Sequence, residues 1–352
     1  MPAQWGIVLA LGSALLFGAS TPMAKLLLGS GIDPWLLAGL LYFSAGVGLA
    51  ASLLLRTLAG FGTREPPLNW NDLPWLLLVV VTGGLVAPVL LMVGLSTTEA
   101  SAAALLLNLE GVATIAIAWF VFREGADRRI VIGASAIIAG AVLLSWQGST
   151  GSISWGAIAI AGAAIAWAID NNLTRKISGA DPVQIAMIKG LVAGPANLVL
   201  AVINQPALPT AGQIAAAAGI GFVGYGVSLV WFVLALRHLG AARTGAYFAL
   251  APFVGVLLAV TVLSEPVTPR LIVAALLMGI GLWLHITEHH EHLHEHPVQE
   301  HEHMHTHDAH HRHEHGTNVA SGEPHAHRHT HAPLIHGHPH YPDLHHQHGH
   351  KH

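Results

Sequence analysis

Three ionisable side chains lie inside long apolar stretches of a 352-residue chain: Glu110, Asp170 and Lys189. A charge in an apolar medium is costly, so a residue of this kind is expected to face a protein interior and to serve a function. Glu110 is the strongest candidate, because it falls near the middle of its stretch. Burial disfavours the charged form of a carboxyl, which would enable Glu110 to carry a proton. The alternative is a structural hydrogen bond to a neighbouring helix.

Asp170 and Lys189 occupy matching positions in consecutive apolar stretches, so their depths agree at roughly 10 Å from the nearer end. We expect the two side chains to form an ion pair, which either takes part in solute binding or only fixes the packing. Asn171 and Asn172 follow Asp170 in the chain. Their amides are expected either to contact a solute or to bond one helix to another.

Three more polar residues complete the candidates for substrate binding or coupling: Lys25, Asn108 and Tyr247. Lys25 is expected either to attract anionic solutes at one mouth of the protein or to extend to lipid headgroups. Glu265 ends its apolar stretch near Arg270, and a local ion pair is its expected role. The chain shows no Gly-rich phosphate loop, nucleophile elbow or two-histidine helix motif. We therefore expect no enzyme activity and no catalytic residue.

Histidine dominates the end of the chain, where 25 of the 27 histidines fall between Glu288 and His352, most of them at every second position. Imidazole binds Zn, Cu, Ni and Co, and neighbouring Glu and Asp side chains can complete a coordination shell. We expect a divalent metal to bind there; the alternative is a pH-responsive polymer. The expected ligands are His289, His290, His292, His294, His296, His301, His303, His305, His307, His310, His311, His313, His315, His325, His327, His329 and His331.

The histidine-rich tail cannot bury a core, so without a ligand it is expected to be disordered. It carries 3 Lys and Arg against 9 Asp and Glu, a formal charge of −6. Metal binding, or protonation of the histidines, would make the tail cationic. A cationic tail would move towards anionic lipid headgroups or towards the mouth of the protein.

The rest of the chain is too apolar for a soluble domain. Hydrophobic residues make up 53% and charged residues 10% of the chain, with a mean hydropathy of +0.56, whereas soluble proteins carry about 25% charged residues. The chain has no cysteine, which excludes disulfides, thiolate metal sites and cysteine nucleophiles. A helix of roughly 20 apolar residues crosses a bilayer. We expect ten transmembrane helices, near residues 5–28, 34–55, 73–95, 101–122, 130–147, 154–174, 183–203, 212–236, 243–263 and 270–287.

Basic residues predict the orientation, because they are retained on the cytoplasmic side of a membrane. With the amino terminus inside, the four joints that face the cytoplasm hold nine basic residues, whereas the opposite joints hold Arg270 and, at a helix end, Lys25. We expect a multi-pass protein of the plasma (inner) membrane with both termini in the cytoplasm. The sequence leaves a homodimer open and indicates no nucleic acid partner.

Landmarks in the first half of the chain return in the same order in the second half. The pairs are Trp5-Gly6 with Trp155-Gly156, Asp33-Pro34 with Asp181-Pro182 and, without gaps, Ala100 to Glu124 with Ala241 to Glu265. Each half holds five spans, so the second half enters the membrane upside down, as in many secondary transporters. The expected fold class is an all-α integral membrane protein of two inverted five-helix repeats. The expected segments are residues 1–148, residues 149–287 and the tail, residues 288–352.

Residues 17–25 (FGASTPMAK), residues 237–243 (RHLGAAR) and the helix from Ala251-Pro252 to Ser264-Glu265 carry a resemblance to a known family. They resemble the EamA domains of the drug/metabolite transporter superfamily, and the resemblance extends over both halves of residues 1–287. It implies ten helices in two EamA repeats, cytoplasmic termini and transport of small solutes, usually efflux.

The expected function is secondary-active export of small organic metabolites or drugs by alternating access, with a metal-binding tail and no cofactor required for transport. The alternatives are a transporter of a divalent metal (Ni, Co or Zn) and a membrane protein that buffers metal. A metal crossing the membrane would need several His, Cys or carboxylate ligands at one depth. The apolar body offers few such residues, which favours the organic solute.

Overall fold

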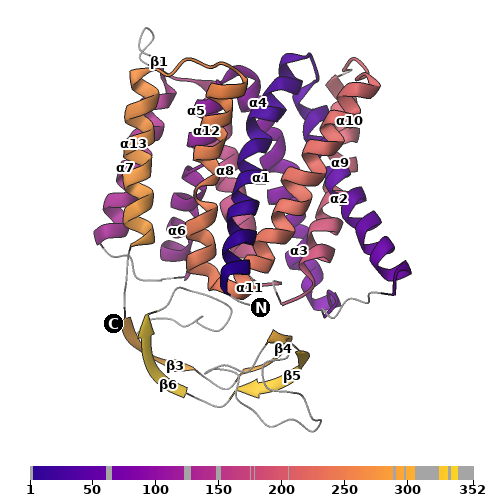
Figure 1. The fold of residues 1–352 in the computed structure, drawn as a ribbon, viewed down its shortest axis with the longest axis vertical. Coiled ribbons are helices and arrows are strands. Elements are labelled where there is room, and N and C mark those ends of the chain that lie inside the picture. The colour runs from indigo at the N-terminus through magenta and orange to yellow at the C-terminus, as the bar shows by residue number, and fades with distance from the viewer. Residues whose placement is uncertain are drawn as a thin grey trace.

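The computed structural model describes a bundle of long helices that run up and down along one axis (Figure 1). It describes residues 3–60, 66–122, 128–147, 152–174, 176–177, 179–204, 206–287, 291–296, 299–305, 325–331 and 334–339. In this part of the chain, nine helical runs are long and apolar enough to cross a membrane, and Ala251–Val262 is a shorter apolar helix. The chain is a multi-pass membrane protein, as its composition predicts.

The first half forms five crossings. Its elements are α1 (Ala3–Gly29), α2 (Pro34–Leu58), η1 (Trp70–Asp72), α3 (Leu73–Val79), η2 (Val80–Val86), α4 (Ala87–Thr97), α5 (Ala100–Leu106), α6 (Leu109–Phe122) and α7 (Arg128–Ser145). Helix α2 begins after Asp33, whose carboxylate accepts hydrogen bonds from the first free N–H groups of the helix, and proline at the first position suits a helix start. The third crossing joins η1, α3, η2 and α4, and the fourth joins α5 and α6.

The second half repeats this order. Its elements are α8 (Trp155–Thr174), α9 (Pro182–Ala201), η3 (Val202–Asn204), α10 (Ala211–Ile220), η4 (Gly221–Val227), α11 (Ser228–Phe248), α12 (Ala251–Val262) and α13 (Pro269–Ile286). Asp181 begins α9 as Asp33 begins α2, with its carboxylate accepting from the N–H of Val183. Two short strands, β1 (Trp146–Gln147) and β2 (Ser152–Ile153), pair between the halves.

Helix α11 contains the end of one crossing and the beginning of the next. The ring centroids of Phe232 and Phe248 lie 4.7 Å apart, whereas a straight helix would separate residues at this spacing by about 24 Å. The chain must therefore turn back between these two residues. Helix α12 completes the ninth crossing, so the fold has the ten crossings expected from the sequence.

The two halves share an irregularity that the sequence analysis did not predict. The segments η2 and η4 are both π-helical. They begin 141 residues apart, at Val80 and Gly221, which is also the separation of Ala100 and Ala241. A wider π-helical turn interrupts the regular backbone hydrogen bonds and often marks a functional position.

Corresponding helices of the two repeats pack against each other, α7 against α13 and α2 against α9. A Cβ atom on Gly281 would lie 2.5 Å from the carbonyl oxygen of Gly133, and one on Gly133 would lie 2.7 Å from that of Gly281. These glycines are 148 residues apart, as are Asp33 and Asp181. Corresponding residues thus meet at a pseudo-two-fold axis, and the missing side chains allow the close approach.

The described residues of the tail form four short strands. They are β3 (Glu291–His296), β4 (Gln299–His305), β5 (His325–His331) and β6 (Leu334–Pro339). Strand β3 pairs with β6, and β4 pairs with β5, both antiparallel. In Figure 1 the strands lie beyond the lower end of the bundle, the end at which α1 begins and α13 ends.

The contact between α2 and α9 can be tested with two matched substitutions. A Cβ atom on Gly190 would lie 2.6 Å from backbone atoms of Tyr42 and Gly46, whereas one on Gly219 would meet nothing within 4 Å. We expect Gly190→Ala to lower the free energy of unfolding by about 1–3 kcal/mol. Gly219→Ala should raise it by up to about 1 kcal/mol, because alanine favours helix. Thermal unfolding in detergent measures both; equal stabilities would contradict this packing.

Candidate functional site

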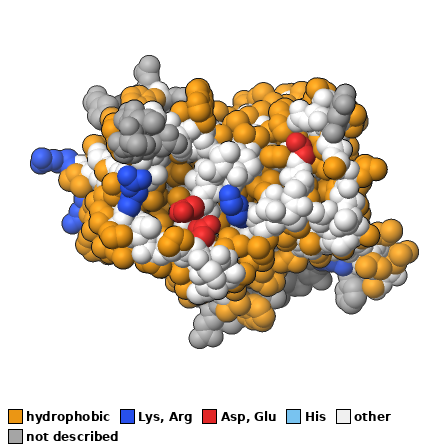
Figure 2. Space-filling model, turned by 90° about the horizontal axis from the view of Figure 1, so that it is seen from above, with side chains coloured by type: hydrophobic (Ala, Val, Ile, Leu, Met, Phe, Trp, Pro, Cys, Tyr) orange, Lys and Arg blue, Asp and Glu red, His pale blue; other side chains and the backbone are white. Residues whose placement is uncertain are grey.

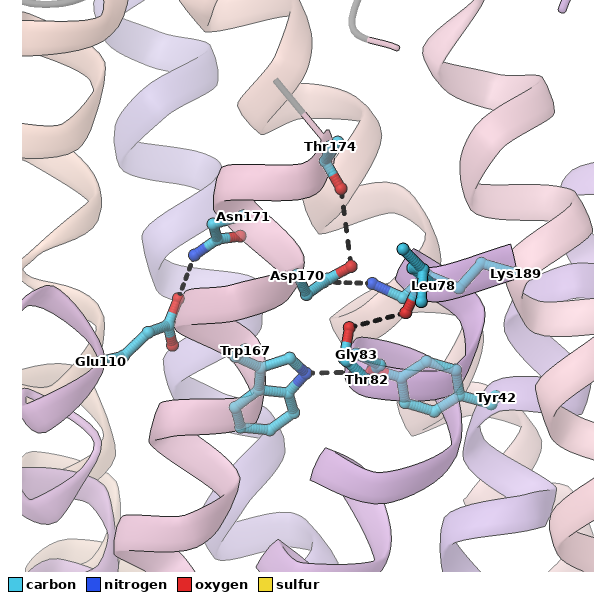
Figure 3. Close-up of polar contacts among 10 residues, drawn as sticks. All are labelled: Tyr42, Leu78, Thr82, Gly83, Glu110, Trp167, Asp170, Asn171, Thr174 and Lys189. Carbon is cyan, nitrogen blue, oxygen red and sulfur yellow. Dashed lines mark hydrogen bonds and ion pairs between the residues drawn. The ribbon is translucent and has the colours of Figure 1, made fainter. Parts of the chain in front are cut away.

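Two adjacent residues of α8, Asp170 and Asn171, connect this helix to two other helices (Figure 3). Nζ of Lys189, on α9, lies 2.5 Å from Oδ2 of Asp170, and the two side chains are 9% and 6% exposed. Thr174, four residues further along α8, donates a longer hydrogen bond of 3.5 Å to Oδ1 of the same carboxylate. The ion pair predicted from matching depths is confirmed.

Gly83 in η2 makes room for the Asp170 carboxylate. A Cβ atom on Gly83 would overlap the carboxylate oxygens, so a larger residue would displace the ion pair. The carbonyl oxygen of Gly83 accepts hydrogen bonds from Oη of Tyr42 at 2.8 Å and from Nε1 of Trp167 at 3.1 Å. A π-helical turn leaves carbonyls available for such side chains. Segment η2 therefore positions α2, α8 and the ion pair relative to one another.

Glu110, at the beginning of α6, contacts the same part of α8. Its Oε1 accepts a hydrogen bond of 2.6 Å from Nδ2 of Asn171. Glu110 is half-buried and Asn171 is exposed, so this pair is accessible, whereas Asp170 and Lys189 are sealed in the core. The negative charge strengthens the hydrogen bond, which would weaken when the carboxyl takes up a proton.

Three other predicted residues do not join this cluster. The side-chain amides of Asn108 and Asn172 donate to carbonyl oxygens three and four residues earlier in the chain, at 3.0 and 2.8 Å. Tyr247 is half-buried near the end of α11. These two amides therefore bond to carbonyl oxygens nearby in the sequence, and a role for the three residues in binding stays a prediction.

Lys25 and Glu265 both bind backbone groups at helix ends, and a role of Lys25 in solute binding stays a prediction. Nζ of Lys25 donates to carbonyl oxygens at the end of α4, and the carboxylate of Glu265 accepts from the first N–H groups of α5. Arg270 donates instead to the carbonyl oxygen of Trp146 at 2.8 Å. The expected pair of Glu265 with Arg270 is therefore wrong: unbonded groups at helix ends compete successfully for charged side chains.

The structure describes only part of the predicted metal-binding tail. His289, His290, His307, His310, His311, His313 and His315 lie outside the described residues. The other ten predicted ligands lie on β3, β4 and β5. Among the residues that the structure describes, no three His, Asp or Glu side chains come close enough to hold a metal.

The sequence analysis missed Gly83 and Tyr42. Both act through the π-helical backbone, which composition and periodicity do not reveal. A signal was nevertheless present, because the 141-residue alignment of the halves, extended upstream, places Gly83 opposite Gly224. A glycine at equivalent positions of two repeats indicates a close approach of another element.

Neutralising one member of the buried pair should harm the protein more than neutralising both. Removing one partner of a buried ion pair costs about 3–5 kcal/mol, whereas replacing both is often neutral. We expect Asp170→Asn to lower thermal stability and yield strongly, and Asp170→Asn with Lys189→Met to restore most of the loss. A double variant that is as unstable as the sum of the single variants would contradict this coupling.

Comparisons with known proteins agree with this architecture. The EamA-like transporter family matches residues 4–146 and 154–287. An uncharacterized transporter of Methanothermobacter thermautotrophicus is 27% identical over 298 residues, covering 81% of this chain and 87% of that protein. The uncharacterized transporter YyaM of Bacillus subtilis is 23% identical over 292 residues, covering 78% and 91%. A protein crystal structure superposes with a TM-score of 0.60 and 19% identity over 80% of this chain and 98% of that chain. The chain therefore belongs to the EamA-like transporter family.

Proposed function

We propose that this protein exports small organic solutes across the plasma (inner) membrane by alternating access, with both termini in the cytoplasm. Its family supports transport of a small solute, and its relatives are named transporters without a stated substrate. The observation that carries the proposal is the polar cluster built on Asp170 and Asn171. It joins α6, α8 and α9 within an apolar bundle, and such residues in membrane helices mark solute and ion pathways.

The fourth crossing supports an opening at the lower end of the bundle. Every residue of α5 is buried, whereas the described side chains of α6 are half-buried or exposed. Helix α5 packs against α1, α8 and α12, while α6 packs mainly against α8. Figure 1 shows α5 near the upper end and α6 near the lower end. The distribution of basic residues favours a cytoplasmic lower end, and with this orientation a solute would reach Glu110 from the cytoplasm.

Proton exchange at Glu110 provides a means of energy coupling. With the carboxylate charged, a charge-assisted hydrogen bond from Asn171 holds α6 to α8. With a proton bound, the same contact is weaker, and α6 is freer to move relative to α8. A proton gradient would then bias the conformational cycle, because the two protonation states favour different packing of α6.

The alternative of a transported metal has less support. A dehydrated transition metal needs several ligands at one level. The described part of the body brings together no three such side chains, and Asp170 is already paired with Lys189.

The substitution Glu110→Gln tests the coupling, because it keeps the shape of the side chain and removes its proton exchange. Purified protein in vesicles is assayed for uptake of a panel of labelled metabolites and metals, with and without a pH gradient. We expect Glu110→Gln to abolish acceleration by the gradient while solute exchange across the membrane continues.

Asn171→Ala tests the contact itself, because it keeps the carboxyl group but removes the hydrogen bond by which the two protonation states differ. It should therefore also lose most of the acceleration by the gradient. Gradient-driven flux that is unchanged in Glu110→Gln would contradict coupling at this residue. Metal flux as the only flux would contradict an organic solute.

We also propose that the tail binds divalent metal, and the register of its strands supports this proposal. Three histidine pairs lie directly opposite each other in the pairing of β4 with β5: His301 with His329, His303 with His327 and His305 with His325. Residues at alternate positions share one face of a strand, and opposite residues have Cβ atoms about 4.5–5.5 Å apart. A register of this kind would favour metal binding by histidines from both strands.

Exchanging neighbouring residues tests this register at constant composition. His301→Glu with Glu302→His, together with His303→Met and Met304→His, moves two histidines to the other face of β4. Calorimetry measures Zn²⁺ or Ni²⁺ binding to the full chain, and in the exchanged chain both the affinity and the number of ions bound should fall. A chain ending at Thr287 should lose this binding. Unchanged binding in the exchanged chain would contradict the pairing and leave composition as the cause.

A further inference from the structure

The turn between α4 and α5 lies at the upper end of the bundle. Helix α5 is buried along its whole length in this conformation. The turn itself consists of Thr98 and Glu99, where α4 and α5 meet in Figure 1. Alternating access, the function proposed above, requires that this end open when the lower end closes.

Two opposite charges hold the turn from its two sides. Nζ of Lys25, on α1, donates to the carbonyl oxygens of Leu95 at 2.6 Å and Thr98 at 2.7 Å. The carboxylate of Glu265, after α12, accepts from the N–H groups of Ala100 at 2.7 Å and Ser101 at 2.9 Å. A cation suits the C-terminal end of a helix and an anion suits the N-terminal end, so each charge matches the end that it holds.

The two charges belong to different repeats. Lys25 lies in the first crossing of the first repeat, and Glu265 follows the fourth crossing of the second repeat. Figure 2, which looks onto this end from above, shows acidic and basic side chains close together near the middle of a largely apolar and neutral face. A movement of one repeat relative to the other would therefore have to break at least one of the two sets of contacts.

Two features near the turn would lower the free-energy cost of opening it. Ser264, next to Glu265, has φ 55°, a left-handed conformation that is unfavourable for a residue other than glycine. The hydroxyls of Thr98 and Ser101 are buried and have no hydrogen-bond partner among the described residues. Water would satisfy both hydroxyls if the turn opened, which offsets part of the loss of the charged contacts.

We propose that Lys25 and Glu265 are gating residues, which hold the α4–α5 turn at the outer end of the solute pathway, and that at least one of them must release the turn for the solute to leave. This role rests on alternating access but does not depend on which solute is carried. Lys25 thereby acts on helix α4 of its own repeat, and Glu265 acts across the repeats on α5. Each residue holds the turn through its own hydrogen bonds, so loss of either residue should favour the open turn.

The absence of cysteine from the chain permits a direct test. Ser101→Cys places one thiol at a buried hydroxyl position of α5, and a membrane-impermeant maleimide is applied in turn to each face of the membrane. We expect Lys25→Met or Glu265→Gln to raise the labelling rate from one face by at least about tenfold, because each removes a charge-assisted hydrogen bond.

Glu99→Gln is the matched control. Glu99 is exposed at the same turn, directly precedes α5 and makes no side-chain hydrogen bond to the helix end. Its substitution therefore removes a nearby charge and leaves the hydrogen bonds of Lys25 and Glu265 in place. Its labelling rate should stay at that of Ser101→Cys alone. Ser96→Cys, at an exposed position, reports that the reagent reaches this face, and thermal unfolding reports that each variant is folded.

The outcomes separate the gate from the transport function. Faster labelling in the two gate variants, but not in Glu99→Gln, supports the gate even in vesicles without a known solute. Unchanged labelling in folded Lys25→Met and Glu265→Gln overturns it. Equal acceleration in all three variants also overturns it, because a general loss of charge would then be sufficient. A supported gate together with no flux of any solute would instead contradict the proposed transport.

Discussion

The ion pair between Asp170 and Lys189 constrains much of the surrounding structure. Neither charge is tolerable alone in an apolar bundle, so α8 and α9 must remain in register. Gly83 must stay a glycine, because the carboxylate occupies the space of a side chain there. The next residue of α8, Asn171, is then directed towards Glu110 on α6. One buried contact thus sets the relative positions of helices that carry the accessible polar pair.

The two repeats share this design but not its charges. Gly83 of η2 packs against Asp170, and Gly224 of η4 packs against Ser20. Ser20 and Asp170 are 150 residues apart, as are the tryptophans that open the two repeats. The same backbone contact therefore exists twice, with a hydroxyl in one copy and a carboxylate in the other. The two repeats therefore share the backbone framework, whereas the buried carboxylate is present in one copy of this contact.

The sequence predicts the crossings, the repeated architecture and the ion pair, because each depends on the length, order or depth of apolar stretches. It also places a joint between the stretches 212–236 and 243–263, which is where the chain turns back within α11. It does not predict the π-helical segments, since these arise from the packing of neighbouring helices. The partners of Lys25 are backbone groups about 70 residues away, and those of Glu265 are about 165 residues away. No local pattern encodes them. The alternating histidines of the tail have the period of a strand, but their polarity alone favoured disorder.

The glycine contacts along α2/α9 and α7/α13 have a mechanical consequence. Backbone atoms of one helix lie close to those of the other there, so the two helices of each pair are in close contact. Close van der Waals contact resists separation of packed helices, whereas small sliding movements between them remain possible. These contacts could therefore serve as the axis about which one five-helix unit rotates against the other. Resistance to this rotation would come from the charged contacts at the ends of the bundle, because a given rotation displaces atoms more the further they lie from the axis.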